Sequence, residues 1–262
     1  MTPPVRVFAS TTSHKREPLL PTLEIFGRLG LRDVDLNLHH ILVERTPVDD
    51  IEAAIVANGL RIHVLSGGWC DFFHETPRID ETFESVARQV ALARRFGVAM
   101  LRLFFGRLAF EDYSPPAREV LCGNLKRLSR EHADVTFVFE NHDGASLHPE
   151  VCADVLDRVG RPNIRMNFDP INFAKAGVDP IAALDVVRRF VGHVHLKGLA
   201  RGEYCEFGDG DVDLDPVLTS LVAGGYRDGF TVEYEGPHDG TVRLYRSVAR
   251  AREALGDSGT MG

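Results

Sequence analysis

The segment FVFENH, residues 137–142, ends an apolar, strand-forming run with a carboxylate and further polar side chains. Three later segments repeat this arrangement: IRMNFDPIN (164–172), GHVHLKG (192–198) and FTVEYEG (230–236). We take one side chain of a metal-binding type from each segment, and these are Glu140, Asp169, His195 and Glu233. The spacings between them are 29, 26 and 38 residues (169 − 140, 195 − 169 and 233 − 195). One strand, one helix and two loops take roughly 30 residues. The spacing therefore predicts one ligand from each of four successive strand ends.

Strand-like and helix-like segments alternate along the chain. Runs typical of strands are residues 5–10, 32–38, 60–66, 99–105, 135–140, 163–169, 192–197 and 230–235. Amphipathic spacing predicts helices at 20–29, 48–58, 78–96, 118–132, 149–159, 180–190, 214–223 and 241–255. Strict alternation predicts a parallel sheet with right-handed crossovers. Eight such units predict an α/β fold that closes as a single (β/α)8 TIM barrel.

The length supports one domain. The chain has 262 residues, and a (β/α)8 barrel takes roughly 250. No linker or low-complexity tract divides it, so we expect one barrel domain at 1–255 and a disordered tail, GDSGTMG, at 256–262. A doubly wound open sheet is the alternative. Its dinucleotide-binding version is disfavoured because no GxGxxG motif follows the first strand.

Composition limits the classes of function. The formal net charge of −8 argues against a nucleic-acid partner, whose binding proteins are normally basic. The N-terminus has no apolar signal-peptide core, and no apolar run approaches the roughly 18 residues of a membrane span. The four cysteines are far apart and form no CxxC motif. We therefore expect a protein of the cytoplasm, with reduced thiols and no membrane partner.

Residues at the carboxyl ends of barrel strands face the active site. A lone carboxylate there would more often cap a helix or pair with an arginine, but four ligand-type residues at one-unit spacing favour a metal. In HVH, His193 and His195 share one face of a strand. We assign the core role to His193 and the ligand role to His195, which is nearer the strand end. The same choice arises in VEYE, where we take Glu233 as the ligand and expect Glu235 to pair with a basic residue or to line the rim.

Three carboxylates and one imidazole make a hard, oxygen-rich site. Such a site suits Mn²⁺, Mg²⁺ or Co²⁺, with Zn²⁺ also possible. Further polar or aromatic side chains are candidates for contact with a substrate at the mouth, and these are His142, Asn172, Lys197, Arg201, Trp69, Arg102 and His63. For the polar ones, a hydrogen bond to backbone or a salt bridge is an equally good interpretation. For Trp69, packing in a loop is the alternative to an apolar wall over a bound sugar.

FVFENH, NFDPIN, HVHLKG, FGDGDVDLDPVL and GGYRDGFTVEYEG together resemble the xylose isomerase-like TIM barrels, which include sugar phosphate isomerases and epimerases. The resemblance covers the whole barrel and is densest from residue 135 to 236. It implies a single divalent metal held by Glu140, Asp169, His195 and Glu233, and the ligand set makes Mn²⁺ our expectation. It supports His195 over His193, since the second histidine of HxH is the usual ligand. It also implies a homo-oligomer, a dimer or tetramer.

Two positions depart from the ketose 3-epimerases of that family. Those enzymes usually carry a histidine three residues after the metal aspartate, where this chain has Asn172, whereas their arginine six residues after the metal histidine is matched by Arg201. Many relatives read HLKD, and here Gly198 replaces the aspartate. These departures disfavour a ketose 3-epimerase.

The resemblance implies a metal-dependent isomerase or epimerase that acts on a carbohydrate-like hydroxy-ketone through an enediolate. Glu140 and Glu233 would be the catalytic carboxylates that take and return the proton. The alternative is a lyase on the same site, a dehydratase of the inosose or dehydroshikimate type. A non-catalytic sugar-binding barrel and an abasic-site endonuclease are less favoured, because all four ligand types are retained and the chain is acidic.

Overall fold

A computed structural model describes residues 5–237 and 240–256. Eight parallel strands form a closed barrel in the order β1-β10-β7-β6-β5-β4-β3-β2, which confirms the predicted (β/α)8 fold. The strands are β1 (Val7–Ser10), β2 (Asp33–Asn37), β3 (Arg61–Ser66), β4 (Met100–Phe104), β5 (Thr136–Glu140), β6 (Ile164–Phe168), β7 (Val191–Leu196) and β10 (Phe230–Val232).

Helices follow the strands as the alternation predicts. They are α1 (Leu19–Arg28), α2 (His39–Leu42), α3 (Val48–Ala57), α4 (Arg78–Arg95), α5 (Pro115–Glu131), α6 (Pro149–Val159), α7 (Pro170–Lys175), α8 (Pro180–Val187), α9 (Asp215–Ala223) and α10 (Gly240–Leu255). Short 3₁₀ turns are η1 (Thr11–His14), η2 (Phe110–Asp112), η3 (Gly144–Leu147) and η4 (Arg188–Phe190). The sequence did not predict α2 or α7, nor the antiparallel hairpin of β8 (Gly198–Ala200) and β9 (Glu203–Cys205).

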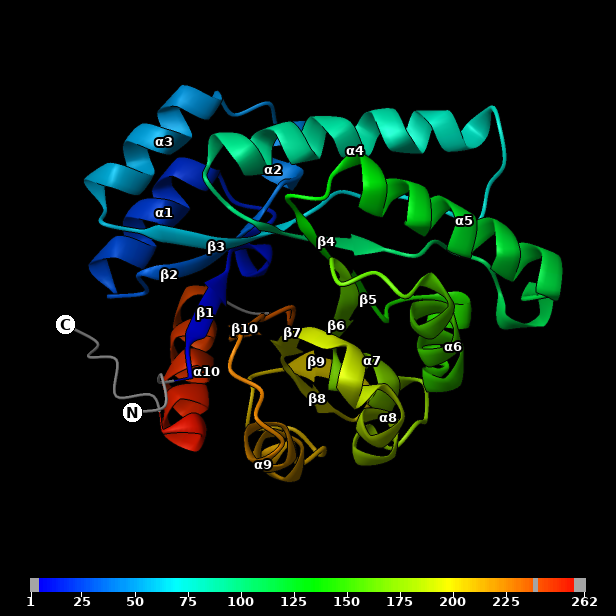
Figure 1. Cartoon of the computed structure of the whole chain (residues 1–262). Helices are drawn as coiled ribbons and strands as arrows, with labels where there is room; N and C mark the ends of the chain where they lie inside the picture. The colour runs from blue at the N-terminus through cyan, green and yellow to red at the C-terminus, as the bar shows by residue number, and fades with distance from the viewer. Residues whose placement is uncertain (1–4, 238–239, 257–262) are drawn as a thin grey trace. The chain divides into compact units, whose positions relative to one another are not determined.

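The chain divides into two compact units, and the first contains residues 1–65 and 194–262. In this unit β1 pairs in parallel with both β10 and β2, and β10 pairs with β7. The register places Ser10 opposite Asp35 and Thr231 opposite His195. Helices α1 and α3 lie side by side at the blue end of the chain (Figure 1). These pairings determine which side chains of β1, β2, β7 and β10 can meet.

The second unit contains residues 66–193. Strands β4, β5 and β6 pair in sequence order, so that Phe104 lies opposite Glu140 and Glu140 opposite Asn167. Around them the long helices α4 and α5 and the shorter α6 and α8 are visible in Figure 1. Phe139 stacks on Phe105 with ring centroids 4.8 Å apart, within a core of buried aromatic residues. This buried aromatic core packs around the strand that ends at Glu140.

The apolar stripe that the sequence predicts on helix α4 is the face that packs against the core. The predicted stripe of Ile79, Phe83, Val86, Val90 and Ala93 is buried along its whole length. Acidic residues lie in its first turn and arginines in its last, which complements the helix dipole. Burial of such apolar side chains contributes about 1.5–3 kcal/mol each for the larger ones. This burial orders the outer layer of the second unit.

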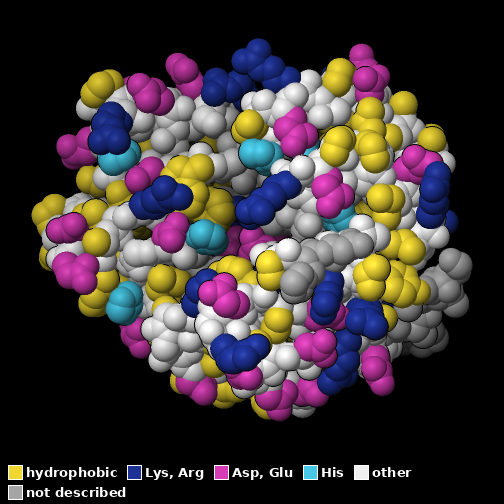
Figure 2. All heavy atoms as spheres, turned by 180° about the vertical axis from the view of Figure 1, so that it is seen from behind, with side chains coloured by type: hydrophobic (Ala, Val, Ile, Leu, Met, Phe, Trp, Pro, Cys, Tyr) yellow, Lys and Arg dark blue, Asp and Glu magenta, His cyan; other side chains and the backbone are white. Residues whose placement is uncertain are grey.

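The structure bears on the expected C-terminal tail and on the expected surface charge. Only Gly256 of the expected tail is described, and 257–262 lie outside the described residues. Within the described ranges, no helix is both long enough and apolar enough to cross a membrane. On the face drawn in Figure 2, acidic and basic side chains are interspersed, with no broad basic patch. The single-domain assignment stays a prediction.

Candidate metal centre

The four candidate ligands all lie at or just beyond the carboxyl ends of their strands. Glu140 is the last residue of β5 and Asp169 follows β6, while His195 is near the end of β7 and Glu233 follows β10. Their exposed fractions are 2%, 0%, 0% and 3%. Glu140 and Asp169 belong to the second unit, and His195 and Glu233 to the first. Buried side chains of these types can bind a cation.

Glu140 contacts two polar side chains of the second unit, Arg102 and Asn172. Arg102 on β4 places its Nε 3.3 Å from Oε2, and the guanidinium lies 4.4 Å from the centre of the Phe104 ring. Asn172 donates from Nδ2 to Oε1 at 3.0 Å. A buried carboxylate needs such partners, and here Oε1 accepts a hydrogen bond while Oε2 lies in an ion pair. The carboxylate is therefore fixed in orientation before any cation or substrate arrives.

Asp169 is placed by the start of α7. Its Oδ1 accepts hydrogen bonds from the backbone N–H groups of Ile171 (2.9 Å) and Asn172 (3.0 Å). Pro170 occupies the first helical position, where its missing N–H is not needed. Asp169 is thus an N-cap as well as a candidate ligand, which joins the two interpretations that the sequence left open.

Asn141 connects the ends of β5 and β6. Its Oδ1 accepts from the backbone N–H of Asp169 at 2.9 Å, and its Nδ2 donates to the carbonyl of Asp169 at 2.8 Å. Asn141 is fully buried. It therefore determines the position of the Asp169 backbone directly beside Glu140.

His195 and Glu233 contact each other in the first unit. Nδ1 of His195 lies 3.4 Å from Oε2 of Glu233, and Nε2 lies 3.5 Å from Oδ2 of Asp35. Ser10 donates from Oγ to Oε1 of Glu233 at 3.3 Å. The backbone N–H of Glu233 donates to the carbonyl of Leu196 at 2.9 Å. The parallel pairing of β10 with β7 thus continues one residue past the strand and fixes the position of Glu233.

Lys197 is a buried cation in the same unit. Its Nζ lies 3.0 Å from Oε2 of Glu235 and 3.6 Å from Oε2 of Glu233, and it faces the ring of Tyr204 at 4.9 Å. Lys15 also contacts Glu235, at 3.1 Å. The charge of Lys197 above all, together with that of Lys15, lowers the pKa of Glu235 against the opposing effects of burial and of Glu233. Glu235 therefore pairs with basic residues, as the sequence suggested.

An aromatic group of the second unit contains the predicted residues Trp69 and His142. Trp69 stacks on Phe104 with centroids 4.7 Å apart, and His142 meets the Phe104 ring edge-on at 4.9 Å. The guanidinium of Arg107 lies 3.9 Å from the centre of the Trp69 ring. Trp69 is 39% exposed. Because Phe104 is the register partner of Glu140, this group forms a partly exposed aromatic surface beside the Glu140 strand end.

Two residues that the sequence suggested as substrate contacts, His63 and Arg201, lie away from the candidate ligands in the contacts given. His63 Nε2 lies 2.6 Å from Oδ1 of Asp33, and its ring stacks on Phe8, near the beginnings of β2 and β1. Arg201 is exposed at the turn of the β8–β9 hairpin, where its φ is +52° and its backbone N–H bonds to Asp211. Neither belongs to the groups of contacts around Glu140 or His195 that the structure gives for the described residues.

Sequence reasoning missed Ser10 and Asp35. Both are fully buried polar residues on neighbouring strands, and both contact a candidate ligand. A signal was present in VFAS and DVDLN, because a buried polar residue in an otherwise apolar strand requires a partner. The partner itself cannot be read without the pairing of β1 with β10 and of β10 with β7.

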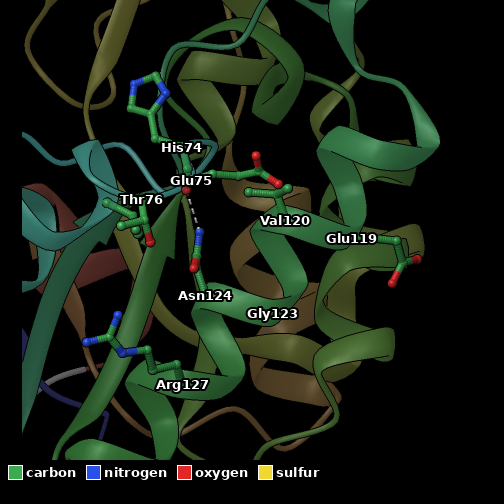
Figure 3. A pocket seen from close by; sticks show the side chains of 9 residues that line it. His74, Glu75, Thr76, Glu119, Val120, Gly123, Asn124 and Arg127 are labelled. Atoms are coloured by element: carbon green, nitrogen blue, oxygen red, sulfur yellow. Dashed lines mark hydrogen bonds between the residues drawn. The ribbon is translucent and has the colours of Figure 1, made fainter.

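A groove of about 510 Å³ lies elsewhere in the second unit (Figure 3). It runs between the loop before α4, with His74 and Glu75, and α5, with Asn124 and Arg127. Asn124 donates to the carbonyl of His74 at 3.0 Å, the bond drawn as a dashed line. Asn124 therefore ties the loop to α5, and the groove contains none of the predicted ligands.

The fold and these contacts define a parallel α/β barrel with buried carboxylates and an imidazole at its strand ends. A family model described as the xylose isomerase-like TIM barrel matches residues 26–255. The chain belongs to the xylose isomerase-like TIM barrel family, as its motifs suggested.

One curated relative is the 3-dehydroshikimate dehydratase of Bacillus anthracis, which is 23% identical over 135 residues. That match spans 48% of this chain and 46% of the relative, so the chain aligns with about half the length of this enzyme. The crystal structure of the probable 3-DHS dehydratase AsbF from Bacillus anthracis is similar with a TM-score of 0.78 and 16% identity, over 94% of this chain and 98% of that one.

Two similar solved structures contain metal ions. The IOLI protein with a bound zinc atom has a TM-score of 0.77 and 18% identity, over 97% of each chain. A xylose isomerase-like TIM barrel protein from Mycobacterium smegmatis in complex with magnesium has a TM-score of 0.77 and 14% identity, over 98% of each chain. At these identities the structures support the shared fold.

Proposed function

We propose that this protein is a divalent-metal-dependent enzyme that removes a proton from the carbon beside a carbonyl group of a small, polyhydroxylated substrate. One observation carries the proposal: Glu140, Asp169, His195 and Glu233 are all buried side chains of metal-binding type at the carboxyl ends of their strands. Glu233, whose Oε2 is 3.4 Å from Nδ1 of His195, is the proposed fourth ligand. A site of this composition suits Mn²⁺, which we propose as the metal, although Mg²⁺, Co²⁺ and Zn²⁺ also favour such ligands.

The charges of the described residues fit a cation. Glu140, Asp169, Glu233 and Asp35 are buried carboxylates. The buried cations given in contact with them are Arg102, which contacts Glu140, and Lys197, which contacts Glu233. Carboxylates and an imidazole are the ligand types that divalent cations of this class bind, which supports the donor set as a metal site.

The side chains around these ligands suit proton transfer. A bound divalent cation would act as a Lewis acid toward the substrate carbonyl oxygen. Glu140 and Glu233 are the proposed bases, and one of them accepts the proton that leaves the α-carbon. Arg102 and Asn172 hold Glu140, and Ser10 holds Glu233. Each carboxylate is therefore oriented by groups that do not react.

Lys197 is the proposed acid. Its ammonium group is buried and lies between Glu233 and Glu235. From there it can stabilise negative charge that develops on substrate oxygen or donate a proton to a departing hydroxyl group. Trp69 and His142 form the aromatic surface beside the Glu140 strand end, and we propose that it contacts the carbon skeleton of the substrate.

Dehydration is the favoured outcome. After the α-proton leaves, a carbon–carbon double bond forms as the β-hydroxyl departs with a proton from the acid, and the product is an enone and water. The curated dehydratase relative supports this outcome. Isomerisation or epimerisation is the second candidate: the same proton returns to a neighbouring carbon or to the opposite face. The family's xylose isomerase-like character supports it.

The experiment incubates the purified protein and Mn²⁺ in deuterated water with a panel of hydroxy-ketones and cyclic hydroxy-enone acids. Product mass separates the outcomes, because a dehydratase releases water and an isomerase incorporates deuterium without that loss. Glu140→Gln and Glu233→Gln should each abolish turnover, while Glu203→Gln, an exposed residue of β9, should not. A protein that binds no metal and exchanges no α-proton would refute the proposal.

Two further predictions from the sequence remain proposals. We propose a homo-oligomer, a dimer or tetramer, which sedimentation velocity tests directly. We also propose a cytoplasmic location, which fractionation of the source cells tests. Neither changes the chemistry of the site.

A further inference from the structure

Ser10 and Asp35 are register partners on the first two strands, and each contacts a different candidate ligand. Ser10 donates to Glu233, and Asp35 lies 3.5 Å from Nε2 of His195. The proposed reaction assigns no chemistry to Asp35. Its position in the centre of β2, completely buried, therefore requires an explanation.

Burial of the Asp35 carboxylate costs free energy unless a hydrogen-bond donor or a positive charge faces it. Among the described residues, none donates a hydrogen bond of normal geometry to either carboxylate oxygen. The ion pair that the structure gives for Asp35 is with the imidazole of His195. A buried carboxylate persists when a polar group directed at it offsets the desolvation. The geometry identifies Nε2 of His195 as that group.

The two ring nitrogens of His195 face different carboxylates. Nδ1 is 3.4 Å from Glu233, which is itself a proposed ligand, and Nε2 is 3.5 Å from Asp35. A neutral imidazole has one N–H group and one lone pair. Histidines that bind metal commonly donate the other N–H to a carboxylate, which fixes the tautomer and ring orientation. The position of Asp35 matches this arrangement.

We propose that Asp35 is a positioning residue: it accepts the Nε2 proton of His195 and so directs the Nδ1 lone pair to the metal. This inference rests on the proposed metal site. Asp35 would act through His195 and would not touch metal or substrate. Asp35 is itself of a residue type that binds metal ions, and its Oδ2 lies 3.5 Å from Nε2 of His195. Direct ligation of a second cation by Asp35 is therefore the outcome that the test must separate.

The chain offers a matched control on the same strand. Asp33 lies two residues before Asp35 and is also paired with an imidazole, since its Oδ1 is 2.6 Å from Nε2 of His63. Asp33→Asn removes a carboxylate beside a histidine without touching a candidate ligand. Asp35→Leu removes the acceptor while keeping the branched skeleton of the side chain, and Asp35→Asn keeps one acceptor oxygen but removes the charge. Together the three variants distinguish the general effect of losing a carboxylate beside a histidine from the specific effect of losing Asp35.

The first measurement is binding of Zn²⁺ alone by calorimetric competition. The wild type should bind one equivalent. Asp35→Leu should bind it about 10- to 100-fold more weakly, Asp35→Asn should lie between the two, and Asp33→Asn should match the wild type. Equal affinity in all variants would overturn the role of Asp35. Two equivalents in the wild type and one in Asp35→Asn would also overturn it, since Asp35 would then be a ligand.

The second measurement is the ¹⁵N NMR spectrum of the histidine rings in the Zn²⁺-loaded wild type. His195, assigned by its loss in His195→Gln, should carry a protected proton on Nε2 and have its metal-shifted nitrogen at Nδ1. The opposite pattern would refute the inference even if every Asp35 variant failed to fold. Absence of Zn²⁺ binding by the folded wild type would instead refute the proposed metal site, so the two failures are distinguishable.

Discussion

Asn172 donates a 3.0 Å hydrogen bond from its side-chain amide to Oε1 of Glu140, while its backbone N–H bonds to Asp169. One residue thus holds two of the proposed ligands. It also occupies the position where ketose 3-epimerases carry a histidine. In this chain the position is occupied by a donor to a carboxylate that is 2% exposed.

Replacing Asn172 with leucine should weaken the metal site. The substitution removes the donor to Glu140 while keeping the branched skeleton of the side chain, and a lost partner of a buried charged group costs about 1–3 kcal/mol. We expect a lower melting temperature of the metal-free protein and weaker Mn²⁺ binding. Asn163→Leu is the control, because Asn163 bonds to Ser129 and to backbone carbonyls away from the ligands. Asn163→Leu should lower the melting temperature and leave the affinity for Mn²⁺ unchanged. Equal Mn²⁺ affinity in both variants would contradict the role of Asn172.

Replacing Lys197 with methionine should reduce turnover far more than replacing Lys15. Both lysines contact Glu235, at 3.0 and 3.1 Å, but only Lys197 also approaches Glu233, at 3.6 Å. Loss of a general acid typically costs 10²- to 10⁴-fold in rate, and we expect about that decrease in kcat for Lys197→Met. Lys15→Met removes the half-exposed partner and should change kcat less than about threefold, as exposed ion pairs contribute little. Similar kcat values for the two variants would exclude Lys197 as the acid.

The strand ends could be predicted because their chemistry is local. The predicted strand 135–140 became β5, which ends at Glu140, since its apolar run stops there. Helix α7 was missed because its six residues are too few to show helical periodicity. Its signal was the capping pattern instead, with Asp169 followed by a proline.

The contacts among the site residues could not be predicted, since they depend on pairing between distant strands. Asp35 and His195 are 160 residues apart (195 − 35). They meet because β2 pairs with β1, β1 with β10 and β10 with β7. For His63, the same dependence on strand position made the sequence-based prediction misleading. Its residue type suggested a substrate contact, but its place two residues into β3 puts it beside Asp33 at the beginning of β2.

Gly198 should not tolerate a side chain, which explains its presence in place of the aspartate of many relatives. A Cβ atom there would lie 2.1 Å from the carbonyl oxygen of Glu206 and 2.7 Å from Sγ of Cys205. Gly198→Ala must therefore displace the β8–β9 hairpin and with it the neighbouring Lys197. We expect a loss of about 1–3 kcal/mol in unfolding free energy and lower kcat, measured by denaturant titration and by assay.

Gly123→Ala is the matched control for that substitution. Gly123 lies within α5, and a Cβ atom there would meet no heavy atom within 4 Å. The change should raise the unfolding free energy by up to about 1 kcal/mol, because alanine favours a helix interior over glycine. Equal effects of the two alanines would contradict the close approach at Gly198.

Asp33 anchors an ionic cluster at the beginnings of β2 and β3. Arg61 donates to both of its oxygens, at 2.9 and 3.0 Å, and His63 lies 2.6 Å from Oδ1. Burial raises the pKa of Asp33, but hydrogen bonds and charge from His63 and Arg61 outweigh it, so the pKa lies well below its ordinary value. The carboxylate is thus stabilised in its ionised form in the folded protein.

This pKa makes Asp33 a source of acid sensitivity. The unfolded value is about 3.9, and the folded value is lower. Its contribution to stability is therefore fully present above about pH 5 and is lost as the pH falls through the folded pKa. Asp33→Asn should have a lower unfolding free energy than the wild type at pH 6, and this difference (the stability gap) should narrow toward pH 3. Urea unfolding at several pH values measures this. Asp134→Asn, which removes an exposed partner of Arg94, should show a smaller gap throughout. A gap for Asp33→Asn that stayed constant down to pH 3 would show that ionisation of Asp33 contributes nothing to the acid limb.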